Sequence, residues 1–249
     1  MTSPALTGVF RSLRIYHGPH APRAGMDALY AKFMAPGDLV IDVGAHVGSR
    51  VSSFRRIGAR VVAIEPQPLL MRALRLIHGH DKNVLLLAAA AAEFDGEMRL
   101  RINSSNPMVS TVSDNFIYRA DGAFGWEGQT WDREIVVPTV TLSRVIAKVG
   151  PPRFIKIDVE GYEDFVLAGL KQRVPALSFE FTTIARDVAL RCLDILSGLG
   201  DYGYDVALGE SQTLTFNRWI SAFEMAEFLR TIPHQANSGD IYARLAERV

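Results

Sequence analysis

The chain has 249 residues, of which 48% are hydrophobic, so it can bury a sizeable core. Its 27 basic and 27 acidic residues cancel, which argues against a nucleic-acid partner held by a global positive field. The single cysteine, Cys192, excludes an internal disulfide and most zinc sites.

The first 35 residues predict a helical segment that carries no membrane signal. Met26, Leu29, Tyr30 and Phe33 recur at helical spacing, and Pro36 ends the pattern. No apolar run reaches the roughly 18 residues that a membrane-spanning helix needs, and no signal-peptide pattern opens the chain. We therefore expect a cytoplasmic protein without membrane insertion.

Residues 39–65 predict a β-α-β unit. A strand over 39–43 leads through a glycine-containing turn into a helix over 49–57, and a second strand covers 61–64. Glu65 follows that strand about 20 residues after the glycines, where nucleotide-binding folds place the acid that binds a ribose diol. The unit predicts a site for an adenosine-containing small molecule.

The turn from Gly44 to Gly48 separates two classes of ligand. Dinucleotide folds use the spacing G-x-G-x-x-G, but here His46 stands where the second glycine would be. Asp42 adds a negative charge that would repel a phosphate and suit a cation. S-adenosylmethionine carries an ammonium and a sulfonium, so the pattern favours this cofactor. The structural alternative is a tight turn without a ligand.

Beyond this unit, apolar strands alternate with amphipathic helices. Such an order predicts an α/β fold with a mostly parallel sheet and helices on both faces. We find no internal repeat or linker, and we predict one domain over residues 1–249. The predicted strands cover 84–91, 98–102, 135–140, 154–159, 177–181, 204–208, 213–217 and 241–245, and the helices 69–78, 142–149, 163–170, 188–198 and 223–229.

Residues 97–140 interrupt that order with a β-rich insertion. Its two strands flank a long polar segment that contains three glycines together with Trp126 and Trp131. A loop of this length inside a compact domain is usually a functional lid or a disordered insert. The aromatic residues favour a lid.

The block FIKIDVEGYE, residues 154–163, places charges at the end of a predicted central strand. Lys156 lies inside the apolar strand, and Asp158 and Glu160 share one face of its end. Open α/β sheets bind ligands at this edge, so all three are catalytic candidates. Alternatively, Lys156 pairs with Asp158 or another acid to neutralise a buried charge.

Two further acids follow or lie in neighbouring strands. Glu93 comes after the strand at 84–91 and could accept a hydrogen bond from an adenine amine, although a plain turn explains it equally well. Glu180 lies in the strand at 177–181 and is expected to point into the same cleft as a base or an acceptor-orienting group. The alternative for Glu180 is a solvent-facing carboxylate.

At these residues the sequence resembles the FkbM-type S-adenosylmethionine-dependent methyltransferases. The family's blocks occur in order between about residues 36 and 181. The resemblance implies the Rossmann-like class I methyltransferase sheet of seven strands with the last antiparallel. The turn often carries asparagine where this chain has His46. The matching blocks are Asp42 to Gly48, Glu65-Pro66, Ser110-Thr111, Val137 to Leu142 and, above all, Phe154 to Glu163.

The resemblance also implies roles for single residues. The turn after the first strand would contact the methionine part of the cofactor, Glu65 the ribose and Glu93 the adenine, with Asp158 at the junction with the acceptor. The cofactor-binding candidates are Asp42, Gly44, Ala45, His46, Gly48, Glu65, Pro66, Glu93 and Asp158. The catalytic candidates are Asp158, Glu160, Glu180, His46 and Lys156.

The implied reaction is methylation of a hydroxyl on a sugar, glycan or secondary metabolite. A hydroxyl needs a base as the new bond forms, and the sequence does not rank the candidates. We expect no metal, because the sequence shows no dense cluster of Asp and Asn residues; metal activation is the alternative. The rival functions are an NAD(P)-dependent oxidoreductase and a non-catalytic nucleotide-binding protein, and the oligomeric state stays open.

Overall fold

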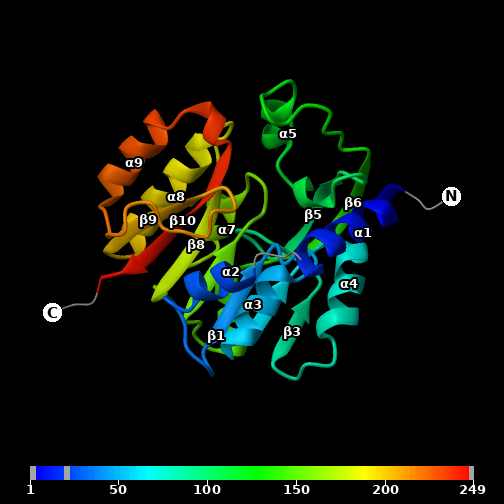
Figure 1. Cartoon of the computed structure of the whole chain (residues 1–249), viewed down its shortest axis with the longest axis horizontal. Helices are drawn as coiled ribbons and strands as arrows, with labels where there is room; N and C mark the ends of the chain where they lie inside the picture. Colours follow the sequence, from blue (N-terminus) through cyan, green and yellow to red (C-terminus); the bar gives the residue numbers. More distant parts are fainter. Residues whose placement is uncertain (1–3, 20–22, 247–249) are drawn as a thin grey trace.

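A seven-stranded sheet forms the centre of the computed structural model, which describes residues 4–19 and 23–246 (Figure 1). Its order is β3-β2-β1-β7-β8-β10-β9, and only β10 runs antiparallel to its neighbours. This confirms the expected mostly parallel sheet with an antiparallel last strand. The strands are β1 (Leu39–Val43), β2 (Arg60–Ile64), β3 (Val84–Leu87), β7 (Phe154–Ile157), β8 (Ala176–Thr182), β9 (Tyr202–Leu208) and β10 (Ser238–Leu245).

Alternate strand residues pack on opposite faces of this sheet, because successive side chains of a strand point in opposite directions. Ile41 and Ile155 join the core beneath α6, α7, α8 and α9, whereas Val40 and Phe154 join the core beneath α2, α3 and α4. Helices therefore cover both faces, as predicted. They are α2 (Arg23–Tyr30), α3 (Ser49–Ile57), α4 (Pro68–His78), α6 (Leu142–Val149), α7 (Glu163–Ala168), α8 (Arg186–Leu199) and α9 (Ala222–Thr231).

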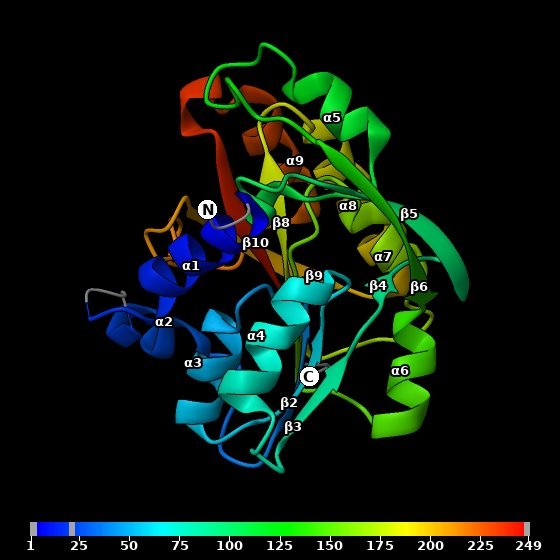
Figure 2. The ribbon, with the colours of Figure 1, turned by 90° about the vertical axis from the view of Figure 1, so that its right-hand side faces the viewer.

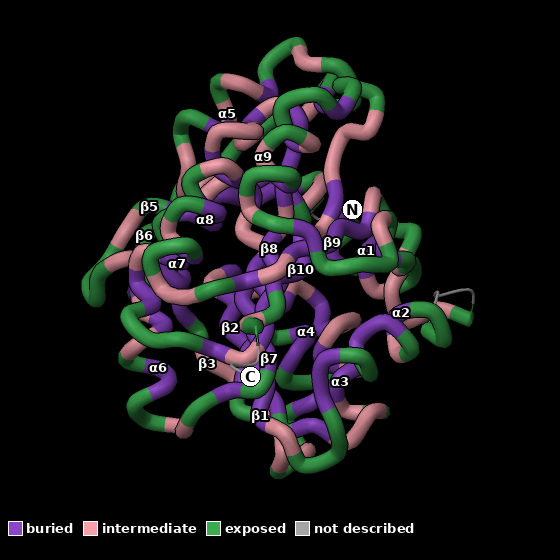
Figure 3. The backbone as a smooth tube through the Cα atoms, turned by 90° about the vertical axis from the view of Figure 1, so that its left-hand side faces the viewer, coloured by how far each residue is buried: buried purple, intermediate pink, exposed green. Residues whose placement is uncertain are grey.

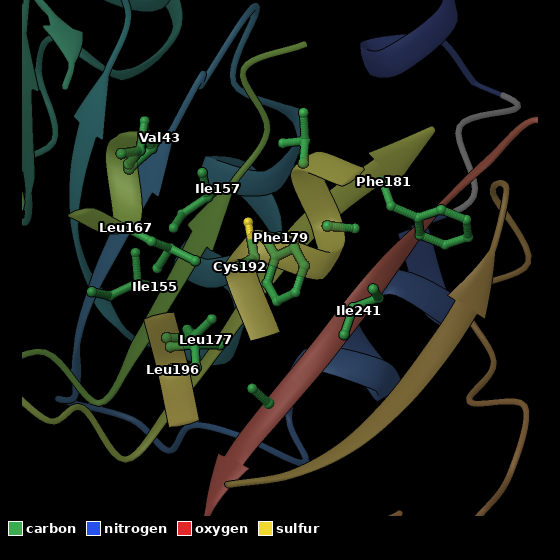
Figure 4. Packing of buried hydrophobic residues seen from close by; sticks show 14 of the residues in the cluster. Val43, Ile155, Ile157, Leu167, Leu177, Phe179, Phe181, Cys192, Leu196 and Ile241 are labelled. Atoms are coloured by element: carbon green, nitrogen blue, oxygen red, sulfur yellow. The ribbon is translucent and has the colours of Figure 1, made fainter. Parts of the chain in front are cut away.

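The larger of these cores lies between the central strands and α8. Figure 4 shows Ile157 of β7 and Phe179 of β8 packed beside Cys192 and Leu196 of α8. Cys192 is buried and has no disulfide partner. The buried residues concentrate along the central strands and the inner sides of the helices, and the outer loops are exposed (Figure 3).

The strand predicted over residues 84–91 is split in the structure. β3 ends at Leu87, and Ala90–Ala91 form the short strand β4, which pairs with a different sheet. A tight turn, in which the Ala89 N–H donates to the Leu87 carbonyl at 3.1 Å, separates the two. The chain therefore leaves the central sheet after Leu87, and the residues that follow, Ala89 to Ala91, line the cavity described in the next section.

The segment at 97–140 contains a second sheet of three strands in the order β4-β6-β5. β5 (Gly96–Ile102) and β6 (Arg133–Val140) pair antiparallel, and Figure 2 shows them curving along one side of the molecule. The predicted long loop between them contains the 3₁₀ turn η1 (Pro107–Val109) and the helix α5 (Asp114–Ala120).

The N-terminal helix α1 (Pro4–His17) packs on α4, where Val9 meets Leu70 and Ala73 (Figure 2). This segment is helical, as predicted. Within residues 4–19 and 23–246, no helix has the length and apolarity needed to cross a bilayer.

The predicted strand at 213–217 is wrong. The carboxylate of Asp205 accepts the backbone N–H of Phe216 at 2.9 Å, which takes that group away from any strand pairing.

Candidate active site

A cavity lies at the carboxyl ends of the parallel strands, the edge at which open α/β sheets bind ligands. The loops after β1, β2, β3 and β7 form much of its wall. The predicted site residues in this wall are Gly44, Ala45, His46, Glu65, Pro66, Asp158, Glu160 and Glu180. The predicted site residues outside the wall are Asp42, Gly48, Glu93 and Lys156.

Gly44 allows the loops after β1 and β7 to touch. Its φ is +79°, and a Cβ at this position would lie 2.9 Å from the carbonyl carbon of Asp158 and closer still to its oxygen. Glycine alone fits such a contact. The sequence suggests that this glycine makes room for a ligand, but the structure shows that it first makes room for the neighbouring loop.

Gly48 has a packing role as well. Its φ is +83°, and a Cβ there would lie 2.8 Å from Leu74 Cδ2 and 2.9 Å from His78 Nε2, both on α4. The glycine therefore lets α3 begin close against α4. Gly48 does not line the cavity, and the cofactor contact that the resemblance implies for it stays a prediction.

Glu65 stands at the tip of β2, and its carboxylate is held by two backbone groups. The His46 N–H donates to Oε2 at 2.9 Å, and the Gln67 N–H donates to Oε1 at 2.8 Å. The residue is 3% exposed. Burial raises its pKa to about 8, although the two backbone hydrogen bonds oppose the shift. The carboxylate is thus fixed in place at the cavity wall.

Asp42 and Lys156 are neighbours in the register of β1 and β7 and share one face of the sheet. Lys156 is 0% exposed, and its Nζ contacts Asp240 at 2.7 Å and Asp158 at 3.2 Å. The structure therefore gives Lys156 the ion-pair role that the sequence left as the alternative, because its ammonium does not reach the cavity. Burial raises the pKa of Asp42 to about 7.

Three carboxylates meet in the cavity wall. Asp158 and Glu160 follow β7, Glu180 lies on β8, and one carboxylate oxygen of each is within 4.8 Å of the others. Because β7 ends at Ile157, Asp158 lies in the loop and not in the strand, which the sequence predicts over 154–159; Glu160 follows in the same loop.

Their surroundings give the three carboxyl groups different protonation states. Burial alone would raise the pKa of Asp158, but the positive charges of Lys156 and Arg50 outweigh it and hold that pKa below its usual range. Burial, and then the negative charge of Asp158, raises the pKa values of Glu160 and Glu180 well above theirs. Asp158 is therefore the group that stays ionised at neutral pH.

His46 also lies in the wall, with φ of +52°. Burial lowers its pKa to about 4, so the imidazole is neutral near pH 7. Its ring meets that of Tyr16 edge-on with centroids 5.7 Å apart. Its Nε2 is buried and has no hydrogen-bond partner among the described residues.

Glu93 is turned to a different partner. Its Oε2 accepts a hydrogen bond from the Tyr162 hydroxyl at 3.0 Å, and Ala89 to Ala91 take the place in the wall where the sequence expects Glu93. Glu93 thus lies outside the cavity wall, and its adenine contact stays a prediction.

Comparison with known families identifies the protein family of this chain. A family model described as the methyltransferase FkbM domain matches residues 42–206. The chain belongs to the FkbM methyltransferase family. It is thus an S-adenosylmethionine-dependent methyltransferase. A search of curated proteins finds no match.

Solved structures resemble this methyltransferase only in fold. An O-methyltransferase from Bacillus cereus in complex with SAH has 12% identity and a TM-score of 0.47, with 99% of this chain and 92% of that chain covered. A TehB-like methyltransferase from Corynebacterium glutamicum has 10% identity and a TM-score of 0.48, with 98% and 100% covered. A precorrin-6y C5,15-methyltransferase from Geobacter metallireducens has 14% identity and a TM-score of 0.46, with 89% and 87% covered.

The wall of the FkbM-family site offers the groups that a nucleoside with an amino-acid tail requires. Glu65 supplies a carboxylate at the tip of β2, Ala89 to Ala91 supply a small apolar surface, and Arg50 supplies a guanidinium. These groups fit S-adenosylmethionine, which has a ribose diol, an adenine ring and a carboxylate.

Several residues of the wall are absent from the sequence prediction. Tyr16 of α1, Met108 of η1 and Glu210 after β9 come from distant parts of the chain, and no local pattern identifies them. Arg50 was within reach of prediction, because it lies two residues after Gly48, in the first turn of the predicted helix. Its guanidinium lies 3.5 Å from the Glu210 carboxylate.

Proposed function

We propose that this methyltransferase transfers the methyl group of S-adenosylmethionine to a hydroxyl of a small-molecule or glycan acceptor. The carrying observation is that Asp158 lines the cavity as an ionised carboxylate, held so by Lys156 and Arg50. A hydroxyl is a poor nucleophile unless a positioned base removes its proton as the new bond forms. An ionised carboxylate in the cavity wall meets that requirement.

In this proposal the cofactor lies along the loops after β1, β2 and β3. The Glu65 carboxylate accepts hydrogen bonds from the ribose diol, Ala89 to Ala91 contact the adenine, and Arg50 binds the carboxylate of the methionine part. When bound, the cofactor supplies a methyl group on a sulfonium, which leaves as a neutral thioether. The protein's task is then to orient the acceptor oxygen toward that methyl group.

The contacts of Glu65 also support a sulfonium cofactor over a dinucleotide. Dinucleotide folds direct free backbone N–H groups of the glycine turn at a pyrophosphate. Here the His46 N–H already donates to the Glu65 carboxylate at 2.9 Å. A pyrophosphate at this turn would therefore find that N–H already engaged.

We further propose that residues 1–249 work as one domain in which the segment at 97–140 covers the acceptor. Pro107, Met108 and Ser110 to Val112 belong to the cavity wall, so this segment already reaches the site. Its side chains would contribute to the choice of acceptor.

Two measurements test the function. Isothermal titration with S-adenosylhomocysteine and with NAD should show binding of the first alone; binding of NAD without S-adenosylhomocysteine would refute the proposal. A methyl-transfer screen against sugar and polyketide hydroxyls, with matched amines as controls, should show transfer to oxygen. Transfer to amines alone would refute O-methylation and leave the cofactor assignment intact.

A further inference from the structure

The carboxylates of Asp158, Glu160 and Glu180 have a geometry that a proton-shuttling pair does not require. Three side chains from a loop and a neighbouring strand direct one oxygen each to a common point, with all three oxygens within 4.8 Å of one another. Two oxygens bound to one ion lie at most twice the ion–oxygen distance apart, which is about 4.2 Å for Mg²⁺ and about 4.6–5.2 Å for Ca²⁺. Only one pair of the three can lie opposite across an ion, so a contraction of the cluster by a few tenths of an ångström fits Ca²⁺, and a larger one fits Mg²⁺ or Mn²⁺.

The glutamates of this cluster have buried oxygens without partners. Glu160 is 8% exposed, and its Oε2 is fully covered and accepts no hydrogen bond from any residue in the described ranges. The Oε2 of Glu180 is covered and unpaired in the same way. Buried carboxylate oxygens are normally paired, because an unpaired one is costly. Both oxygens belong to side chains directed at the same point.

The neighbouring donors are already engaged. Lys156 divides its ammonium between Asp158 at 3.2 Å and Asp240 at 2.7 Å. The Thr111 hydroxyl donates to the backbone carbonyl of Glu160 at 2.7 Å and not to its carboxylate. Lys156 and Arg50 thus serve Asp158 and Asp240, and the two glutamates are left without a cationic partner among these residues; a divalent ion in place of their protons would compensate both.

We propose that Asp158, Glu160 and Glu180 bind a divalent cation of the oxygen-preferring class, Mg²⁺, Mn²⁺ or Ca²⁺, at the acceptor end of the cavity. Three carboxylates leave further coordination positions open, because these ions take six to eight oxygen ligands. All three residues line the cavity, so the open positions face the space in which an acceptor is received. An acceptor with two neighbouring oxygens, such as a vicinal diol, would occupy two of these positions.

The ion's role toward the acceptor rests on the proposed function, whereas its binding rests on the cluster alone. A bound divalent ion stabilises the deprotonated form of a hydroxyl. The acceptor O–H bond then breaks with its proton passing to the Asp158 carboxylate, the new C–O bond forms, and the C–S bond breaks with its electron pair on sulfur. The sequence expects no metal because the cluster exists only in three dimensions: Glu180 lies 20 positions or more from the other two ligands.

The test is a titration of the whole protein with Mn²⁺, followed by electron paramagnetic resonance and by calorimetry, in the absence of cofactor and acceptor. We expect one ion per chain, and an affinity at least tenfold lower in both Glu160→Gln and Glu180→Gln. The matched control is Glu210→Gln, which removes a charge from the same wall outside the cluster and should change the affinity less than threefold.

Thermal unfolding and S-adenosylhomocysteine binding verify that each variant is folded. If one glutamate variant fails to fold, the other carries the same test. A wild-type protein that binds neither Mn²⁺ nor Ca²⁺ at millimolar concentration overturns the proposal, and so does wild-type affinity in both glutamate variants. Failure of the function is separate: a protein that binds Mn²⁺ here yet methylates no hydroxyl keeps the ion site. Full turnover after chelation overturns the ion's catalytic role alone.

Discussion

Replacing Gly44 by alanine should show whether this position needs glycine only for its positive φ or also for the close contact with the loop after β7. The φ of +79° costs a residue with a side chain about 1–2 kcal/mol. The new Cβ would lie 2.9 Å from the carbonyl carbon of Asp158, and closer to its oxygen, so the loop after β7 must move by roughly an ångström. That movement strains the hydrogen bond from the Asp158 N–H to the Val43 carbonyl at 3.0 Å.

These costs add to about 3–6 kcal/mol, since overpacking contributes about 1–3 kcal/mol and a lost hydrogen bond about 1 kcal/mol. Gly128→Ala is the matched control, because its φ is +76° and its added Cβ would meet no atom within 4 Å. Urea denaturation followed by circular dichroism should show a loss of about 1–2 kcal/mol for the control and clearly more for Gly44→Ala. Equal losses would refute the loop-contact reasoning.

Three further predictions concern the charged groups. Glu65→Gln should remove a pH dependence of S-adenosylhomocysteine binding. In the wild type the pKa of Glu65 is near 8, so the carboxylate that accepts the ribose diol forms as pH rises, and the affinity should increase from pH 6 to 8 by up to about tenfold per unit. In the variant the affinity, measured by calorimetry, should not change with pH. Asp158→Asn should abolish methyl transfer and leave S-adenosylhomocysteine binding within a few-fold, as measured by calorimetry and product release. Lys156→Met should lower the free energy of unfolding by about 3–5 kcal/mol in urea, because Asp158 and Asp240 lose their buried partner.

Each of these has a plain contrary result. A pH-independent wild-type affinity would remove Glu65 from the ribose contact. Turnover at the wild-type rate in Asp158→Asn would move the base to another residue. Unchanged stability in Lys156→Met would show that the buried ion pair contributes nothing measurable.

The β-α-β unit was predictable to the residue in places, because its signals are local. The apolar run at 39–43 and the helix at 49–57 have the predicted bounds. Hydrophobic periodicity and glycine turns act within a few residues, so the sequence alone carries them. The split after Leu87 was not predictable in this way, since it depends on the pairing of Ala90 and Ala91 with the distant strand β6.

The residues of the candidate site also fall into two groups, those predicted from the local sequence and those brought together only by the fold. The sequence by itself determined the mostly parallel sheet, the acid at the tip of β2 and the charged loop after β7, because strand ends and their neighbouring residues are read locally. Only the tertiary structure decided that Lys156 forms ion pairs with Asp158 and Asp240, that Glu93 turns to Tyr162, and that Glu180 joins Asp158 and Glu160. Those outcomes depend on which strands become neighbours, and strand order is set by packing over the whole chain.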